Sequence, residues 1–341
     1  MDELDLAIID ALITRPRVRW TDLAALLDTS PTTLARRWNR IVDGGLAWVT
    51  AWPGPALWPD LGMAVIRAEL APHGREEVID AMVRLPHSLT VQETTGKYDL
   101  FVLVLFPGWA ALTRSLSSLA ALDGIAASRT EICGRLYGSI QWPLGALSAA
   151  QRSALAEPRK PLPLGGAVEV DEKGRQLFVE LSRDGRSTLK TLAAAFDATA
   201  EAEKRRLDRL VGARLLDLRC DMARAVAGWP VLALVWLRVP ESSLRKVAPK
   251  IAEWRCCRLA VEISGASNLL FALSTHERSQ VSDLLSDLEA LDPGLRVNEV
   301  QYVTLQRKLS GRVLDDEGRA SEVIPLDPWY SAQPTGRADV T

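Results

Sequence analysis

The sequence predicts an α+β protein in which two winged helix-turn-helix heads alternate with two ferredoxin-like bodies. Three observations indicate this class: a capped helix-turn-helix pattern over residues 20–46, an internal repeat at a fixed offset, and apolar segments in β-α-β-β-α-β order. The chain of 341 residues is long enough for several domains, and its 48% hydrophobic content allows each of them a core.

The segment 20–46 contains two short helices joined by a tight turn. Ser30 is a favourable N-cap, and Pro31 occupies the first helical position, where its missing N–H group is not needed. The second helix is predicted to direct a set of apolar side chains inward at spacings of three and four: Leu34, Trp38, Ile41 and Val42. A further helix is predicted near residues 4–12. Together the three helices form a helix-turn-helix unit, whose last helix lies in the DNA major groove.

The chain repeats itself at an offset of 169 residues without a gap. In the head, Leu23-Ala24-Ala25 corresponds to Leu192-Ala193-Ala194, and Arg36-Arg37 corresponds to Arg205-Arg206. In the body, Glu93 corresponds to Glu262, Gly96 to Gly265, and Leu122-Asp123 to Leu291-Asp292. Chance matches would not keep one register over more than 100 residues, so we infer a duplicated two-domain unit.

Each body is predicted to follow the split β-α-β-β-α-β order of ferredoxin-like domains. In the first body the elements fall at 63–70, 76–85, 88–94, 100–106, 109–122 and 125–136. In the second body they fall at 231–239, 243–252, 257–263, 269–274, 277–291 and 296–306. A strand or wing at 47–52 and a hinge rich in Pro and Gly connect the first head to its body.

The predicted boundaries follow from these elements and from shifts in composition. The heads occupy 1–52 and 170–222, and the bodies occupy 60–141 and 229–310. A linker at 142–169 contains a short Ala-rich helix and a Pro-stiffened stretch. After the second body the sequence becomes polar, so residues 311–341 are predicted to be a mostly disordered tail.

Composition excludes several classes of protein. The formal net charge of −2 means that any DNA contact must come from a local patch. Four cysteines without CxxC spacing and three histidines do not provide the pattern of a structural zinc site. No apolar run reaches the length of a membrane span, and the acidic N-terminus lacks a signal-peptide pattern. We therefore expect a cytoplasmic protein with reduced thiols, without membrane contact, metal or cofactor.

These features together resemble the Lrp/AsnC (feast/famine) family of transcriptional regulators, here as a tandem duplication in one chain. The resemblance is carried by DTSPTTLARRWNRIVDGGL at 28–46 and TTGKYDLFVLVLF at 94–106, and it covers about residues 2–140 and more weakly 170–310. It implies a DNA-binding head, a body that pairs with another body, and an effector site for a small molecule, often an amino acid. Family members are typically half this length and assemble as dimers or larger oligomers. The two bodies are therefore expected to pair within one chain, which then forms a homo-oligomer.

The basic first recognition helix, at about 31–44, supplies candidates for DNA contact. Hydroxyl groups at a helix N-terminus bind phosphates or base edges, and arginine is the commonest direct reader of guanine. We predict DNA contacts from Ser30, Thr32, Thr33, Arg36, Arg37 and Arg40. Further phosphate contacts are expected from Arg15, Arg17 and Arg19, just before the second helix. The alternative is a basic face that is merely solvated.

The second recognition helix, at about 199–211, carries the corresponding candidates Arg205, Arg206 and Arg209. Glu201 and Glu203 lie in its first turn, where carboxylates repel phosphates, although they also suit a helix N-terminus electrostatically. We therefore predict that the first head is the main reader of DNA. The second head is predicted to be weak, degenerate or directed at something else.

The resemblance places the effector near a Gly-x-x-Asp turn formed by Gly96, Lys97, Tyr98 and Asp99. Asp99 either accepts a hydrogen bond from the ammonium group of a ligand or caps the turn. In the second body the turn reads Gly265-Ala266-Ser267-Asn268, so the acidic residue is lost. This change puts an equivalent second effector site in doubt.

The sequence therefore predicts a sequence-specific transcriptional regulator that responds to a small-molecule effector and has no enzymatic activity. Two alternatives stay open. One is an enzyme like the siroheme decarboxylases of haem biosynthesis, in which two such units pair to hold a tetrapyrrole. Against it, His73, His87 and His276 show no sign of a catalytic cluster. The other alternative is a ligand-binding partner protein that has lost DNA binding.

Overall fold

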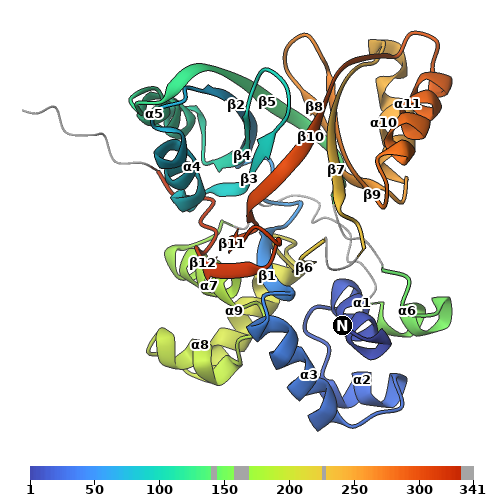
Figure 1. Ribbon diagram of the computed structural model, residues 1–341. Helices are drawn as coiled ribbons and strands as arrows, with labels where there is room; N and C mark the ends of the chain where they lie inside the picture. The colour runs from blue at the N-terminus through green and yellow to red at the C-terminus, as the bar shows by residue number, and fades with distance from the viewer. Residues whose placement is uncertain (140–143, 157–168, 225–227, 332–341) are drawn as a thin grey trace, which may run out of the picture.

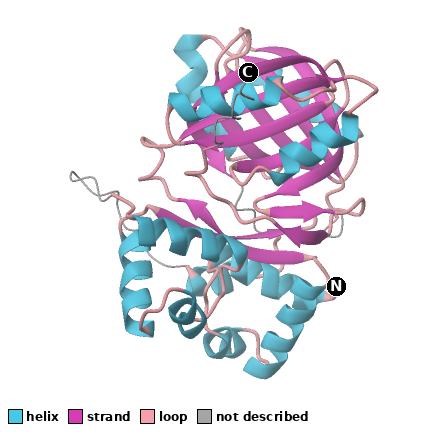
Figure 2. Cartoon of the chain, turned by 90° about the vertical axis from the view of Figure 1, so that its left-hand side faces the viewer, coloured by secondary structure: helices cyan, strands magenta, loops and turns pink. Residues whose placement is uncertain are grey.

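The computed structural model describes residues 1–139, 144–156, 169–224 and 228–331. Two helical heads lie on one side of a closed β-barrel (Figure 1), and Figure 2 shows the strands of the barrel above the helices of the heads. Within the described ranges, no helix combines the length and the hydrophobicity that a membrane span requires.

Each head is a three-helix unit followed by a strand. The first head contains α1 (Glu3–Thr14), α2 (Trp20–Leu26), α3 (Pro31–Asp43) and β1 (Ala47–Pro53). The second head contains α7 (Glu172–Arg183), α8 (Leu189–Ala195), α9 (Ala200–Gly212) and β6 (Leu216–Met222). The third helix of each head begins at a hydroxyl N-cap, Ser30 or Thr199, whose side chain accepts a backbone hydrogen bond from the first turn. The capping residues therefore fix where both recognition helices start.

The strands that follow the heads pair with each other and do not form two separate wings. β1 and β6 make an antiparallel two-stranded sheet, with Thr50 opposite Arg219. Two arginines related by the repeat also connect the heads, because each donates to backbone carbonyl oxygens of the other head. Arg17 donates to Gly185 and Ser187, and Arg186 donates to Pro16 and Val18. The heads are thus a pseudo-twofold pair. The predicted phosphate contact of Arg17 is wrong, because its guanidinium group is committed to the second head.

Both bodies have the predicted order of strands and helices. The first consists of β2 (Gly62–Leu70), α4 (Arg75–Arg84), β3 (Ser88–Thr94), β4 (Leu100–Phe106), α5 (Trp109–Ala120) and β5 (Ile125–Ser139). The second consists of β7 (Val231–Arg238), α10 (Glu241–Ala252), β8 (Cys257–Ile263), β9 (Leu269–Thr275), α11 (Ser279–Leu291) and β10 (Arg296–Leu309). β5 and β10 run beyond their predicted ends because these extra residues pair with the other body.

Eight strands of the two bodies close into one barrel. Their order is β10-β3-β4-β2-β5-β8-β9-β7, and β7 pairs back onto β10. Two seams, β5 with β8 and β10 with β3, join the bodies within the chain. Alternate side chains point outward under the helices or inward into a shared apolar core, which includes Phe101, Leu103, Leu234, Val261 and Leu270.

The linker and the tail differ in part from the prediction. The Ala-rich helix of the linker is α6 (Ala149–Leu155), whereas residues 142–143 and 157–168 lie outside the described residues. The prediction of a disordered tail is wrong for residues 311–331. There, β11 (Arg312–Leu314) pairs with β10, and β12 (Ala320–Val323) pairs with β11. The polar composition concealed Leu326, which is fully buried in the same core as the barrel interior. The last ten residues of the predicted tail, 332–341, lie outside the described residues.

Candidate functional site

The geometry of α3 leaves most of its predicted DNA-contacting residues on its outer surface. Leu34, Trp38 and Ile41 are buried in the core of the first head. Val42 was predicted to share this face, but its side chain is 41% exposed, at the edge of the buried stripe. The hydroxyl group of Ser30 is used within the helix, where it accepts from the backbone N–H of Thr33 at 3.1 Å. The exposed members of the predicted set are Ser30, Thr32, Arg36 and Arg40, and Arg37 and Thr33 are half-buried.

Two carboxylates of α1 partly neutralise this surface. Arg37 Nη1 lies 2.6 Å from Asp2 and 2.9 Å from Asp5, and Arg40 Nη2 lies 3.1 Å from Asp5. The hydrogen bond to Arg37 lowers the pKa of Asp2 and correspondingly raises the pKa of Arg37. Within the described part of the chain, Arg36 has no ion-pair partner. Arg36 is therefore the cation of α3 that is best placed to meet an external phosphate or base.

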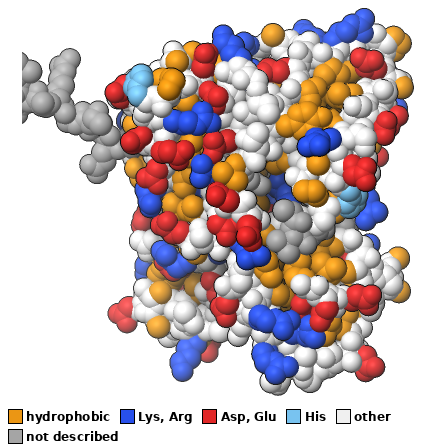
Figure 3. Space-filling view, in the orientation of Figure 1, with side chains coloured by type: hydrophobic (Ala, Val, Ile, Leu, Met, Phe, Trp, Pro, Cys, Tyr) orange, Lys and Arg blue, Asp and Glu red, His pale blue; other side chains and the backbone are white. Residues whose placement is uncertain are grey.

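The surface of α9 is more completely neutralised. Three cations of α9 are paired within the second head: Arg206 with the buried Glu203, Lys204 with Asp208 at 2.6 Å, and Arg209 with Asp171 at 3.3 Å. Glu201 is exposed in the first turn, and Arg205 is the exposed counterpart of Arg36. Figure 3 shows Lys and Arg side chains at the lower end of the molecule, over the heads, interspersed with Asp and Glu.

The turn at 96–99 is held by contacts inside the first body. Gly96 has a φ of +98°, a conformation that favours glycine. Asp99 accepts a hydrogen bond from the backbone N–H of Leu70 at 2.8 Å, and its other oxygen lies 3.5 Å from Arg75 of α4. Lys97 Nζ lies 5.7 Å from the centroid of the Tyr98 ring.

Asn268 has the same structural role in the second body. Its Oδ1 accepts from the backbone N–H of Val239 at 2.8 Å, and its Nδ2 donates to the carbonyl of the same residue at 2.7 Å. Val239 corresponds to Leu70 under the repeat. The change from acid to amide therefore preserves the turn, which favours the capping role of Asp99 over ligand contact.

A buried polar network lies next to this turn, on the inward face of the barrel. Arg67 of β2 is 4% exposed and donates to Glu131 of β5 at 2.9 Å and to Glu299 of β10 at 2.6 Å. Its guanidinium group lies 4.4 Å from the ring centroid of Trp236 and 4.7 Å from that of Tyr98. The indole Nε1 of Trp236 donates to the second oxygen of Glu131 at 2.9 Å. Two carboxylates and two aromatic faces thus compensate the burial of one cation.

Around Arg67 the end of the barrel is partly open to solvent. The side chain of Glu299 is 33% exposed and that of Arg129 is 41% exposed, with Arg129 Nε 3.3 Å from Glu131. Gln301 donates to Glu299 at 2.8 Å. We call this end the polar mouth, formed by Arg67, Tyr98, Arg129, Glu131, Trp236, Glu299 and Gln301. The Glu299 carboxylate and the Arg129 guanidinium group are thus both accessible to solvent, while each keeps an ion pair inside the barrel, Glu299 with Arg67 and Arg129 with Glu131.

Sequence reasoning missed the polar mouth except for Tyr98. A signal was present, because Arg67 interrupts the apolar strand MAVIRAEL and Glu131 interrupts the last strand of the first body. A charge at an inward-facing strand position needs a buried partner. Glu299, one of the partners of Arg67, lies more than 200 residues away in the sequence, so no local pattern could predict the pairing.

The histidines lie outside the polar mouth. His87 is 1% exposed, and its ring contacts the hydroxyl of Ser115 on α5 at 3.2 Å and stacks on Tyr330 at 5.4 Å. Burial lowers the pKa of His87 to about 4. His73 and His276 are exposed. In the described ranges, His, Cys, Asp and Glu side chains do not gather into a group of three that would hold a metal ion.

Family models match two domains in the first half of the chain. An AsnC-type helix-turn-helix domain matches residues 1–41, and an Lrp/AsnC ligand binding domain matches residues 63–137. A match of the first model implies DNA binding by the head. A match of the second implies a small-molecule effector for the body.

Curated relatives cover the same part of the chain. An uncharacterized HTH-type transcriptional regulator of Pyrococcus furiosus is 24% identical over 135 residues, which is 39% of this chain and 90% of the relative. The HTH-type transcriptional regulator LysM of Saccharolobus solfataricus is 22% identical over 138 residues, which is 40% of this chain and 96% of the relative. By these shares, both relatives are less than half as long as this chain.

Among solved structures, a likeness extends over nearly the whole chain. The siroheme decarboxylase NirDL has a TM-score of 0.57 at 12% identity, covering 92% of this chain and 96% of that chain. Its complex with an iron-uroporphyrin III analogue has a TM-score of 0.57 at 14% identity, covering 90% and 93%. At this identity the likeness shows the fold alone. The first half of this chain therefore matches an AsnC-type helix-turn-helix domain followed by an Lrp/AsnC ligand binding domain, and the whole chain has a fold similar to that of NirDL.

Proposed function

We propose that this chain is a DNA-binding transcriptional regulator of the Lrp/AsnC type, in which one chain takes the place of a family dimer. The observation that carries the proposal is the outer surface of α3, where Thr32 and Arg36 are exposed on a helix within an AsnC-type head. The paired strands β1 and β6 hold both recognition helices on one side of the barrel. Assembly into a larger homo-oligomer stays a prediction.

The first head is proposed to be the main reader of DNA. Three cations of α9 are held in ion pairs within their head, against two cations of α3, and α9 also exposes Glu201 near its N-terminus. Each cation that is already paired releases fewer counterions on meeting a phosphate, and an exposed carboxylate repels the phosphate directly. The two heads therefore differ in charge although they share one fold.

Arg36 and Arg205 provide a matched test, because they occupy equivalent positions and both are exposed. We expect Arg36→Ala to weaken binding to a native operator fragment by about tenfold or more, the loss typical of one arginine contact to a base. Arg205→Ala is expected to weaken binding by less than about twofold. Fluorescence anisotropy at fixed salt measures both.

Equal losses in the two variants would reject the asymmetry between the heads. An unchanged affinity in both variants would reject α3 as the DNA-reading element. Circular dichroism of each variant serves as the control for folding, and both residues are exposed, so their removal leaves the core intact.

The effector is proposed to bind at the polar mouth. A zwitterionic amino acid would place its carboxylate on Arg129 and its ammonium group on Glu299, the two accessible charges there. We expect one of the twenty amino acids to raise the melting temperature of the protein. Arg129→Gln should abolish that rise, whereas Arg135→Gln, an exposed change on the same strand, should preserve it. A rise that survives Arg129→Gln would place the effector elsewhere.

An enzyme similar to siroheme decarboxylase is the second candidate. The likeness to NirDL covers 92% of this chain, whereas the curated regulators cover about 40%, so comparison over the full length favours the enzyme more than the regulator. The polar mouth would then have to accept the substrate. Incubation with siroheme under anaerobic conditions, followed by mass spectrometry, tests this activity. Loss of carbon dioxide from siroheme, without binding of operator DNA, would replace the regulator by the enzyme.

A further inference from the structure

The two recognition helices differ at an exposed position in their first turn. Thr32 is the second residue of α3, and its equivalent under the repeat is Glu201, the second residue of α9. Both side chains are exposed. In helix-turn-helix proteins the N-terminal residues of the recognition helix contact base edges in the major groove. The two heads therefore present different chemistry at a position that is expected to face the bases of bound DNA.

The other acids of α9 are already used inside the protein, whereas the carboxylate of Glu201 is not. Glu203, in the same turn, is fully buried and holds Arg206. Asp208 is exposed and pairs with Lys204 at 2.6 Å. Among the residues that the structure describes, Glu201 has no ion-pair partner. Glu201 is therefore the acid of α9 that is best placed to meet a base.

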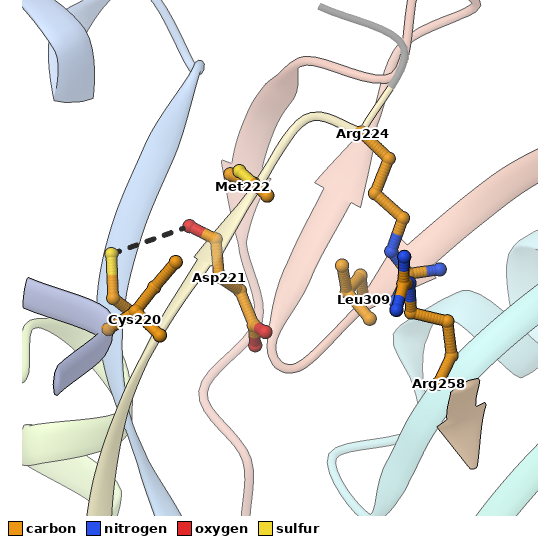
Figure 4. Close-up of a pocket in the computed structure, with 7 residues that line it drawn as sticks. Cys220, Asp221, Met222, Arg224, Arg258 and Leu309 are labelled. Carbon is orange, nitrogen blue, oxygen red and sulfur yellow. Dashed lines mark hydrogen bonds between the residues drawn. The ribbon is translucent and has the colours of Figure 1, made fainter. Parts of the chain in front are cut away.

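The two heads are held in a fixed relation to each other. β1 and β6 pair along their whole length, with Thr50 opposite Arg219, its own equivalent under the repeat. Cys220 and Met222 of β6 are buried in the hydrophobic core of the first head, beside the narrow cavity drawn in Figure 4. The second head therefore cannot swing away while the first head holds DNA, so an unfavourable contact at α9 weakens the whole complex.

A carboxylate discriminates among bases because it accepts hydrogen bonds and cannot donate them. In the major groove cytosine presents the amino donor N4, whereas guanine presents only the acceptors N7 and O6, and thymine presents the acceptor O4 beside a methyl group. A carboxylate that faces acceptors is repelled, and such repulsion gives specificity by rejecting the wrong partner. The hydroxyl group of a threonine both donates and accepts, so it does not impose this choice.

We propose that Glu201 reads cytosine in the half-site under the second head, so that the chain recognises an asymmetric operator. Cytosine is accepted there because its N4 group donates to the carboxylate, and the other bases are rejected. Thr32 makes no such demand at the symmetry-related position under the first head. The proposal rests on the proposed DNA-binding function and deepens it. The second head adds little affinity, yet it restricts the sequences that the whole chain accepts.

The test measures the affinity of the full-length protein, at fixed salt, for an operator fragment and for variants that carry each of the four base pairs at every position. We expect Glu201→Thr to raise the overall affinity and to remove, at one position, a cytosine preference of at least about fivefold, the lower end for one base contact. Glu201→Gln should move that preference towards adenine, which a glutamine amide reads. Thr32→Glu should create a cytosine preference at the position related by the pseudo-twofold axis.

A matched control separates base reading from the charge of the head. Glu172→Gln removes an exposed carboxylate of the second head outside α9, and it should leave every base preference unchanged. Base preferences that are the same in the wild-type protein and in Glu201→Thr would overturn the proposal, while operator binding itself would still support the proposed function. Failure of the wild-type protein to bind any operator fragment would overturn both.

Discussion

Residues that the repeat makes equivalent have diverged inside the barrel. Arg67 and Trp236 are 169 positions apart, and one stacks on the other at 4.4 Å. On the neighbouring strands, Arg129 stands opposite Arg67 and Glu299 stands opposite Trp236. The equivalent positions 67 and 236, identical after the duplication, now carry a cation and an aromatic ring that contact each other, so the two bodies are no longer interchangeable.

Glu131 is the residue on which this complementarity depends most. Glu131→Gln removes the carboxylate that Arg67 and Trp236 share, and it leaves the buried cation with Glu299 alone. We expect the free energy of unfolding to fall by about 3 kcal/mol, the usual loss when a buried ion pair is broken. Urea denaturation measures this loss. The exposed control Glu322→Gln should cost less than about 0.5 kcal/mol, and an equal effect of both changes would contradict the prediction.

Lys308 predicts a dependence of stability on pH. It is fully buried and donates to the carbonyl of Leu85 at 2.6 Å, and burial lowers its pKa from 10.5 to about 7. Between these two values the unfolded chain binds more protons than the folded protein. The free energy of unfolding should therefore rise with pH from 7 towards 10.5, by at most about 1.4 kcal/mol per pH unit.

The variant Lys308→Met isolates this contribution. Urea midpoints at pH 7, 8 and 9 should rise more steeply in the wild-type protein than in the variant. The neighbouring His87 does not contribute in this window, because its pKa of about 4 in the folded protein and 6.5 as a free side chain both lie below pH 7. Identical slopes in the two proteins would show that Lys308 keeps its ordinary pKa.

At the scale of elements, local chemistry decided what could be predicted. The start and the buried face of α3 could be predicted from Ser30, Pro31 and the spacing of its apolar residues. The order of strands and helices in both bodies could be predicted from their apolar segments. The pairing of β1 with β6 and the ordering of β11 and β12 could not be predicted, because both depend on partners far away in the sequence. Residues close in sequence determine whether a segment forms a helix or a strand, whereas contacts between residues far apart in sequence determine which other element it packs against.

The turn at Asp99 allows capping and ligand contact to be separated by experiment. Asp99→Asn should cost less than about 1 kcal/mol, because Asn268 already fills the equivalent role with an amide oxygen. Asp99→Ala should cost about 1–2 kcal/mol, because the backbone N–H of Leu70 loses its acceptor. Thermal denaturation measures both. A folded Asp99→Asn variant that loses its effector response would instead assign Asp99 to the ligand.

At the scale of the whole molecule, the repeat predicted two bodies but not their closure into one barrel. The seams β5–β8 and β10–β3 join strands of different halves, and no periodicity in the sequence marks such a pairing. The polar mouth exists only after closure, because its charged residues come from both halves. This is why the predicted effector site included Tyr98 and missed the carboxylates that surround Arg67.

Closure within the chain predicts how separated halves will assemble. Fragments 1–156 and 169–341, when co-expressed, should form a one-to-one complex, because each supplies one side of both seams. A pair of first halves would bring Arg67 against a second Arg67, and a pair of second halves would bring Trp236 against Trp236 without the carboxylate of Glu131. Native mass spectrometry should therefore show the mixed pair in large excess over either homodimer. A homodimer of 1–156 as abundant as the mixed pair would mean that the divergence of equivalent residues does not control pairing, and that the duplicated chain could also exchange bodies between molecules.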